Sequence, residues 1–187
     1  MKILVVDNND SFTYNIIGLL KSLRIGEIQV EKSDTLLLNS VKDFDKIIFS
    51  PGPGLPKDFN ILRQILQQYK HQKSILGICL GHQAIGDFFG AKLINLFNVY
   101  HGQAHKIQVN TANKLYQHIP NTFSVGLYHS WAVSQENLPN SLICTGMSEN
   151  GIIMSISHKE YDIHGIQYHP ESFMSEFGKQ IMTNFLN

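Results

Sequence analysis

The 187-residue sequence has little charge, and the charge that it has is balanced. Fifteen lysine and arginine residues match fifteen aspartate and glutamate residues, so the formal net charge at pH 7 is zero. No block of basic residues stands out along the chain. Because nucleic acids and anionic membranes attract proteins through excess positive charge, we expect neither of them as a principal partner.

Long hydrophobic runs are also missing. No stretch reaches the roughly 18 apolar residues of a membrane-spanning helix. The first apolar run, KILVVD, is too short for a signal peptide and ends in an aspartate. The two cysteines, Cys79 and Cys144, do not make the framework of a small disulfide-rich domain. These features predict a cytoplasmic protein without a structural disulfide.

The sequence does contain the material for a globular core. Hydrophobic residues make up 43 % of the chain, and its length suits one ordinary domain. No linker, repeat or low-complexity segment divides it. We therefore expect a single domain over residues 1–187.

The first half alternates between short apolar runs and segments with helical spacing. Strands are predicted for KILVVD, EIQVEKS, KIIFS and SILGICL. Helices are predicted for NNDSFTYNIIGLLKSL, FNILRQILQQYKH and HQAIGDFFG, and Asp10 or Ser11 can cap the first of them. Strands that alternate with helices predict an α/β fold with a twisted, mainly parallel sheet flanked by helices.

The second half consists mostly of predicted strands with short connections. These strands are AKLINL, HKIQVN, FSVGLYHSWAVS, SLICTG, IIMSIS and HGIQYH, and a helix is predicted from about Ser175 to Leu186. We expect part of this half to form a small antiparallel layer and part to rejoin the main sheet.

Cys79 follows a predicted strand within the pattern G-x-C-x-G. This pattern is the cysteine counterpart of the nucleophile elbow, which holds its central residue in a strained turn at a strand tip. The flanking glycines would avoid collisions with the neighbouring strand and helix. The N–H groups at the start of the next helix would favour the thiolate. The alternative is that Cys79 is an ordinary buried cysteine.

Two further segments follow predicted strands, where ligands bind in open parallel sheets. His169 and Glu171 lie two residues apart around Pro170, so both side chains can project to one side, as a Cys-His-Glu triad requires. PGPG, at residues 51–54, is a rigid turn that can present a backbone N–H to an oxyanion, and Leu80 N–H can be a second donor. Alternatively, these are a surface histidine and glutamate and a simple proline-rich turn.

A metal site is not expected. His101 and His105 are four residues apart but lack the glutamate of the H-E-x-x-H pattern. Cys144 is predicted to be a core residue of a strand, and Trp131 is expected at the rim of the active site.

The motifs taken together resemble the class I (triad) glutamine amidotransferases along the whole chain. In order, they are DNNDSFTYN at 7–15, SPGPGLP at 50–56, GICLGHQAIG at 77–86, HG at 101–102, YHSWAV at 128–133 and QYHPES at 167–172. The DNNDSFTYN and SPGPG motifs are similar to those of the branch that serves chorismate-using enzymes.

The resemblance implies specific roles for residues at the matching positions. Cys79 would be the nucleophile, with His169 and Glu171 completing the triad. Gly54 and Leu80 would form the oxyanion hole. No metal or organic cofactor is implied. The residues implied to bind the substrate glutamine are Gly52, Pro53, Gly54, Leu80, Gln83, Ser130 and Trp131.

The resemblance also implies a protein partner. A larger, chorismate-binding subunit would receive the ammonia and make anthranilate or, alternatively, aminodeoxychorismate. Two positions depart from the family pattern, because Gln103 stands where a lysine is common and Trp131 where a leucine is common. Two other functions stay open, namely a stand-alone γ-glutamyl hydrolase and a non-catalytic subunit that keeps the fold.

Overall fold

A computed structural model describes residues 1–187 of the protein. The centre of the molecule is a nine-stranded sheet. The strand order is β2-β1-β3-β4-β11-β10-β9-β6-β7. The strands are β1 (Lys2–Asp7), β2 (Glu27–Lys32), β3 (Lys46–Phe49), β4 (Ser74–Ile78), β6 (Gln103–Val109), β7 (Thr122–Leu127), β9 (Leu142–Ser148), β10 (Ile153–His158) and β11 (Ile163–Ile166).

The first five strands in this order all pair in parallel, as the alternation of strands and helices predicts. Strands β1, β3 and β4 are buried almost throughout, which explains their continuous apolar sequences. β2 is at the edge, and its residues alternate between exposed and half-buried over most of its length. The second half of the chain rejoins this parallel region through β11, which pairs with β4.

The other four strands extend the same sheet by antiparallel pairing. A separate two-stranded antiparallel sheet contains β5 (Leu93–Asn95) and β8 (Trp131–Val133). The segment FSVGLYHSWAVS is therefore not one strand, as its sequence predicts, but two strands in different sheets. The break at residues 128–130 separates β7 from β8, and its side chains line the candidate site described below.

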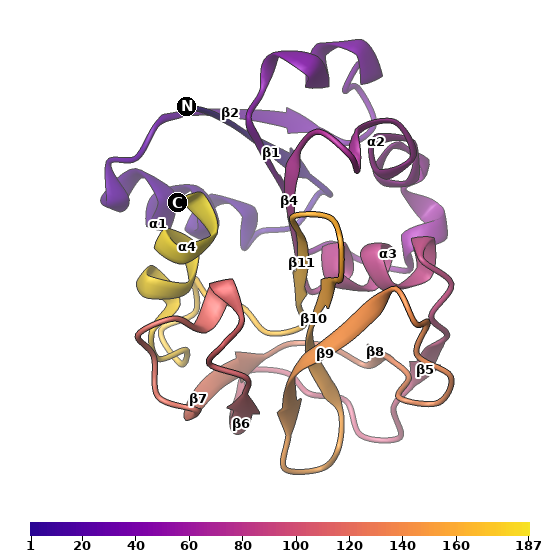
Figure 1. Cartoon of the computed structure of the whole chain (residues 1–187), viewed down its shortest axis with the longest axis vertical. Helices are drawn as coiled ribbons and strands as arrows, with labels where there is room; N and C mark the ends of the chain where they lie inside the picture. Colours follow the sequence, from indigo (N-terminus) through magenta and orange to yellow (C-terminus); the bar gives the residue numbers. More distant parts are fainter.

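Helices cover both faces of the sheet (Figure 1). α1 (Thr13–Leu23) packs beside α4 (Gly178–Leu186), and α2 (Asn60–Tyr69) packs beside α3 (Leu80–Phe88). The remaining helical elements are the short 3-10 turns at Leu38–Asp43, Pro56–Asp58 and Lys114–Tyr116.

The start of α1 differs from its prediction. Neither Asp10 nor Ser11 is the capping residue, because Phe12 occupies that position and makes no side-chain cap. Asp10 instead closes a tight turn just before the helix, where its carboxylate accepts the Phe12 N–H at 2.8 Å. Its backbone carbonyl accepts the Thr13 N–H at 3.1 Å. Asp10 therefore stabilises the start of α1 from two positions before the capping residue.

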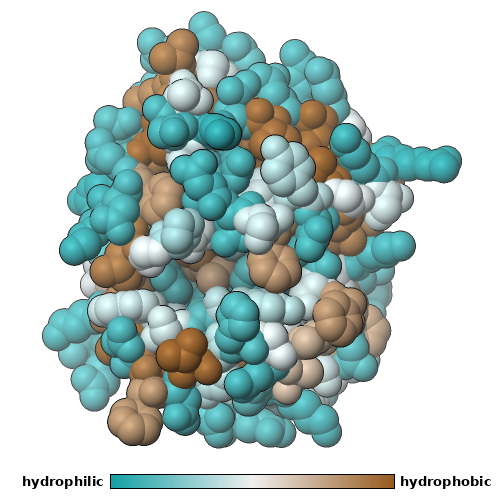
Figure 2. Space-filling view, turned by 180° about the vertical axis from the view of Figure 1, so that it is seen from behind, coloured by the Kyte–Doolittle hydropathy of each residue, from teal (hydrophilic) through white to brown (hydrophobic).

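The core is divided between the two faces of the sheet. Along β1, Ile3 and Val5 belong to one hydrophobic cluster, and Leu4 and Val6 belong to the other. This alternation follows from the two-residue period of a strand. The face in Figure 2 is mainly hydrophilic, with hydrophobic side chains in small separate groups. None of the helices has the length and apolar character needed to cross a membrane.

Candidate active site

Three neighbouring parallel strands end at the candidate site. β3, β4 and β11 lie next to one another in the sheet, so their carboxyl ends meet at one edge. The PGPG turn follows β3, Cys79 follows β4, and His169 comes three residues after β11. The fold therefore brings together segments that are up to 118 positions apart, from residue 51 to residue 169.

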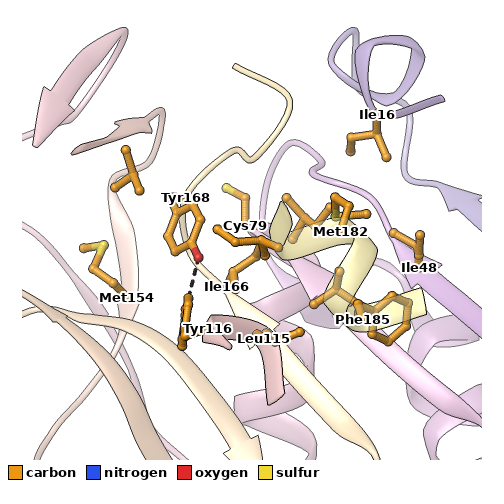
Figure 3. Close-up of a cluster of buried hydrophobic side chains, with 14 of the residues drawn as sticks. Ile16, Ile48, Cys79, Leu115, Tyr116, Met154, Ile166, Tyr168, Met182 and Phe185 are labelled. Atoms are coloured by element: carbon orange, nitrogen blue, oxygen red, sulfur yellow. Dashed lines mark hydrogen bonds between the residues drawn. The ribbon is translucent and has the colours of Figure 1, made fainter. Parts of the chain in front are cut away.

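Cys79 occupies a strained turn between β4 and α3. Its φ of 53° and ψ of −102° lie outside the regions that side-chain-bearing residues favour. The side chain is 7 % exposed and borders the hydrophobic cluster that also contains Ile166 and Tyr168 (Figure 3). Such strain persists only where the surroundings enforce it, and it separates Cys79 from an ordinary core cysteine.

The glycines on either side of Cys79 are required by close packing. A Cβ atom on Gly77 would lie 2.3 Å from the backbone of Gly81, and one on Gly81 would lie 2.6 Å from Phe49. Real Cβ atoms do not approach other atoms so closely. The G-x-C-x-G pattern therefore lets helix α3 start directly against strands β3 and β4, which leaves its first N–H groups beside Cys79.

His169 and Glu171 form a buried pair. The His169 Nδ1 atom lies 2.7 Å from Glu171 Oε1, and their side chains are 2 % and 0 % exposed. Burial alone would lower the pKa of His169, but the nearby Cys79 and Glu171 outweigh it and raise that pKa to about 10. The other ring nitrogen, Nε2, makes no hydrogen bond in the protein. The pair thus holds a protonated imidazole in a fixed orientation next to the Cys79 sulfur.

Two other histidines near the site have lowered rather than raised pKa values. Burial lowers the pKa of His82 to about 3 and that of His129 to about 4. Both are therefore neutral at physiological pH. His129 Nδ1 lies 2.9 Å from the Trp131 carbonyl oxygen, which can only accept, so the proton is on Nδ1. Of these three buried histidines, only His169 is paired with a carboxylate.

A small cavity opens beside Cys79. Its volume is about 130 Å³, and its walls come from the PGPG turn, the start of α3 and the break between β7 and β8. The lining residues are Gly52, Gly54, Cys79, Leu80, Gln83, Tyr128, His129, Ser130 and Trp131. Six of the seven residues expected to bind glutamine are among them, and the exception, Pro53, is exposed to solvent.

Tyr128 and His129 also line the cavity, although the sequence motifs alone gave them no role there. The signal that could have found them is the YHSWAV motif, in which they precede Ser130. Trp131 takes part through its backbone, because its carbonyl oxygen accepts a hydrogen bond from Gln83 Nε2 at 2.9 Å. A backbone contact explains how tryptophan can stand at a position where leucine is common.

Two backbone N–H groups at the cavity have no acceptor. Neither Gly54 nor Leu80 donates a backbone hydrogen bond outside regular secondary structure, and both residues line the cavity. Leu80 is the first residue of α3, so no preceding helical turn can accept its N–H. Gly54 has a φ of +72°, a left-handed conformation that glycine adopts without strain. Both donors remain available to a ligand.

An aromatic cluster covers the His169 ring. The Phe12 and Tyr128 ring centres lie 5.0 and 4.9 Å from that of His169 and 4.7 Å from each other. Asp7 supports the loop that carries Phe12, because its Oδ1 accepts hydrogen bonds from Asn9 N–H and Thr13 Oγ1. The DNNDSFT sequence thus shields the imidazole from water.

Other singled-out residues do not line this cavity. Cys144 is in strand β9 and is half-buried, and burial raises the pKa of its thiol. Gln103 is exposed at the start of β6, where its Oε1 lies 3.2 Å from His105 Nε2. His101 is exposed beside Tyr128. No group of three or more histidine, cysteine, aspartate or glutamate side chains has the arrangement of a metal site.

The fold and the site define an α/β protein that carries a cysteine, a histidine and a glutamate at the tips of parallel strands. The family model for class I glutamine amidotransferases matches residues 4–187. This chain therefore belongs to the class I glutamine amidotransferase family.

Relatives and solved structures agree with this membership. Anthranilate synthase component 2 of Cyanophora paradoxa is 41 % identical, over 99 % of this chain and 98 % of the relative. Aminodeoxychorismate synthase component 2 of Escherichia coli is 37 % identical, with 99 % of both chains covered. A Thermoplasma acidophilum structure, provisionally assigned as part of a GMP synthase, is 25 % identical and superposes with a TM-score of 0.88. That comparison covers 100 % of this chain and 92 % of the other.

Proposed function

We propose that this chain is a glutaminase subunit that releases ammonia from glutamine through a thioester on Cys79. The observation that carries this proposal is the strained Cys79 elbow beside the buried His169–Glu171 pair. A cysteine in that position is a nucleophile with a base next to it, and the base is oriented by a carboxylate.

The first half of the reaction forms the thioester. His169 holds the proton of the Cys79 thiol, so the sulfur attacks the side-chain carboxamide carbon of glutamine as a thiolate. The carbonyl oxygen becomes an oxyanion, which accepts hydrogen bonds from the free N–H groups of Gly54 and Leu80. His169 then donates its proton to the amide nitrogen, the C–N bond breaks, and ammonia leaves.

The second half restores the enzyme. The neutral His169 takes a proton from a water molecule, which attacks the thioester carbon. The C–S bond breaks, glutamate leaves, and the Cys79 thiolate pairs again with the protonated imidazole. Glu171 keeps the imidazole oriented through both halves, because its carboxylate holds Nδ1 at 2.7 Å.

The substrate would lie in the cavity of about 130 Å³ beside Cys79. The residues proposed to bind it are Gly52, Pro53, Gly54, Leu80, Gln83, Ser130 and Trp131. Of these, Pro53 would act through the conformation of the turn, because its side chain is exposed to solvent.

The ammonia would pass to a separate chorismate-binding subunit that makes anthranilate. Relatives named as second components of anthranilate synthase and of aminodeoxychorismate synthase support such a partner. Aminodeoxychorismate is the alternative product, since both kinds of relative are similar to this chain at comparable identity. The two unpaired thiols of Cys79 and Cys144 suit a reducing compartment, which favours the cytoplasm.

The test is glutamate release by the purified chain at saturating glutamine, alone and with the large subunit of each of the two synthases. We expect weak activity alone and a rise of about tenfold or more with the correct partner, because one misplaced oxyanion donor is worth about 3 to 4 kcal/mol. Full activity alone, unchanged by either partner, would instead indicate a stand-alone γ-glutamyl hydrolase. No activity in any mixture would indicate a non-catalytic subunit.

A further inference from the structure

Gln167 is a buried residue that the mechanism above does not use. It follows β11 directly, precedes His169 by two positions and is 0 % exposed. Its Nε2 atom lies 3.6 Å from the Cys79 sulfur, within hydrogen-bonding distance for that element. Its Oε1 atom accepts a hydrogen bond from Gln83 Nε2 at 3.2 Å. One amide group therefore connects the sulfur to the wall of the cavity.

The orientation of this amide follows from a fixed backbone group. A backbone carbonyl oxygen can only accept, so the Gln83 atom that lies 2.9 Å from the Trp131 oxygen must be the nitrogen. The same nitrogen contacts Gln167, so the Gln167 atom that it meets must be the oxygen. The remaining Gln167 atom, which faces the sulfur, is then the NH₂ group. Trp131 thus determines which end of the Gln167 amide contacts Cys79.

We propose that Gln167 is a further catalytic residue of the glutaminase, whose amide N–H stabilises the Cys79 thiolate. This role rests on the proposed function. The amide NH₂ group cannot accept a proton from the thiol, so the contact requires the sulfur to be the acceptor. A charged sulfur accepts more strongly than a neutral thiol, which favours the thiolate. Gln167 is fully buried, so water does not compete for its N–H group, which strengthens the bond further.

The Cys79 sulfur has two neighbouring groups with different roles. His169 exchanges a proton with Cys79, whereas Gln167 has no proton to give up and acts only as a donor. The bond from Gln167 can therefore persist until the sulfur is acylated, and it can form again when the thioester is hydrolysed.

The test measures the ionisation of the sulfur without glutamine. In a Cys144→Ser background, the rate of Cys79 alkylation by iodoacetamide is followed from pH 5 to pH 10. Gln167→Met removes the amide N–H donor without adding a charge, and Gln167→Leu repeats the test in case the methionine prevents folding. We expect the midpoint of the rate curve to rise by about one pH unit, with alkylation at pH 7 about tenfold slower.

A matched control separates this effect from the loss of a buried amide. Asn184 is a buried amide in α4 whose Nδ2 donates to the Leu115 and Gln117 carbonyls, away from Cys79. Asn184→Asp is expected to reduce thermal stability without moving the midpoint of alkylation. The same preparations are assayed for kcat and KM with glutamine, and we expect the Gln167 variants to lose kcat with little change in KM.

The outcomes distinguish this role from the proposed function. An unchanged midpoint in both Gln167 variants, in a chain that does release glutamate, would overturn the role of Gln167 alone. A wild-type chain that releases no glutamate with any partner would overturn the proposed function and, with it, any catalytic role of Gln167.

Discussion

The two ends of strands β3, β4 and β11 carry different kinds of polar cluster. At the carboxyl ends, beside Cys79, His169 Nε2 and Glu171 Oε2 make no hydrogen bond. At the amino ends, every member of the cluster is paired. Buried polar groups without partners cost free energy, so they are expected where a ligand or a reaction uses them.

The cluster at the amino ends of the same strands has the full pairing that is expected of polar groups with a structural role. Lys46, the first residue of β3, donates to Ser74 Oγ at 3.2 Å and to the Phe185 carbonyl at 3.1 Å. Asp162, just before β11, pairs with Lys114 at 3.3 Å and with His164 at 2.9 Å. Burial lowers the pKa of Lys46, and its neighbours keep it bonded. This end ties α4 to the sheet, whereas the other end leaves buried polar atoms without partners.

The largest effect should come from the nucleophile. Cys79→Ser should reduce glutamine hydrolysis by at least about 10⁴-fold, because a serine hydroxyl is far less acidic than a thiol. The melting temperature should stay close to that of the wild type. Cys144→Ser is the control and should keep nearly full activity, since that thiol lies in β9 away from the cavity. The reverse pattern in kcat measurements would refute the assignment of Cys79.

The next effect should come from the proton carrier. His169→Asn should lower kcat by about 10² to 10⁴-fold, the usual contribution of general acid–base catalysis. Glu171→Gln should cost less, because it orients the imidazole and does not itself carry the proton. Near-normal turnover in His169→Asn would mean that His82 or His129 acts as the base, despite the lowered pKa of each.

A substitution at the amino ends of the strands should lower the stability of the protein and leave the rate of glutamine hydrolysis unchanged. Asp162→Ala removes the partner of Lys114 and His164, and we expect a loss of about 1 to 2 kcal/mol in the free energy of unfolding. Asp34→Ala, at an exposed aspartate with no side-chain hydrogen bond, is the matched control and should change little. Urea titration gives the stability, and kcat should be unaffected. A large fall in kcat with unchanged stability would contradict the distinction between the two ends.

The pH dependence of stability should also differ between buried histidines. The pKa values of His82 and His129, about 3 and about 4, lie below the unfolded value of 6.5. The unfolded chain therefore binds more protons as the pH falls below 6.5, and stability should drop by up to about 1.4 kcal/mol per pH unit for each of them. His169, raised to about 10, acts in the other direction, because its contribution is complete below pH 6.5 and is lost as the pH rises toward 10.

The acid effect can be checked with thermal unfolding at pH 7 and pH 5. His82→Gln should reduce the difference in melting temperature between the two pH values. The control, His71→Gln, replaces an exposed histidine and should leave that difference unchanged. An equal acid sensitivity in wild type and His82→Gln would show that other groups control the loss of stability.

Much of the fold follows from local sequence patterns. The runs around Leu4, Ile48 and Leu76 predict buried parallel strands because a strand covered on both faces needs no polar alternation. The break after Leu127 could not be predicted in this way. Apolar residues resume at Trp131 after only three positions, and the switch of sheets depends on pairing with β5 rather than on local preference.

The site shows the same division between local and long-range information. The two glycines that flank Cys79 predict the elbow, and the motif around His169 places the histidine and the glutamate two residues apart. The contact from Gln167 to Cys79 spans 88 positions and joins two strand ends. It depends on the pairing of β4 with β11, which no sequence period encodes. The covering of His169 by Phe12 is long-range for the same reason.

The measurement that tests the central claim most directly is covalent labelling with a glutamine analogue that carries an electrophilic group in place of the side-chain amide. Intact mass spectrometry and peptide mapping would give the number and position of labels. We predict one label per chain, on Cys79, and slower labelling when glutamine is present. The Cys79→Ser variant should carry no label. A label on Cys144, or labelling that persists in Cys79→Ser, would contradict the account.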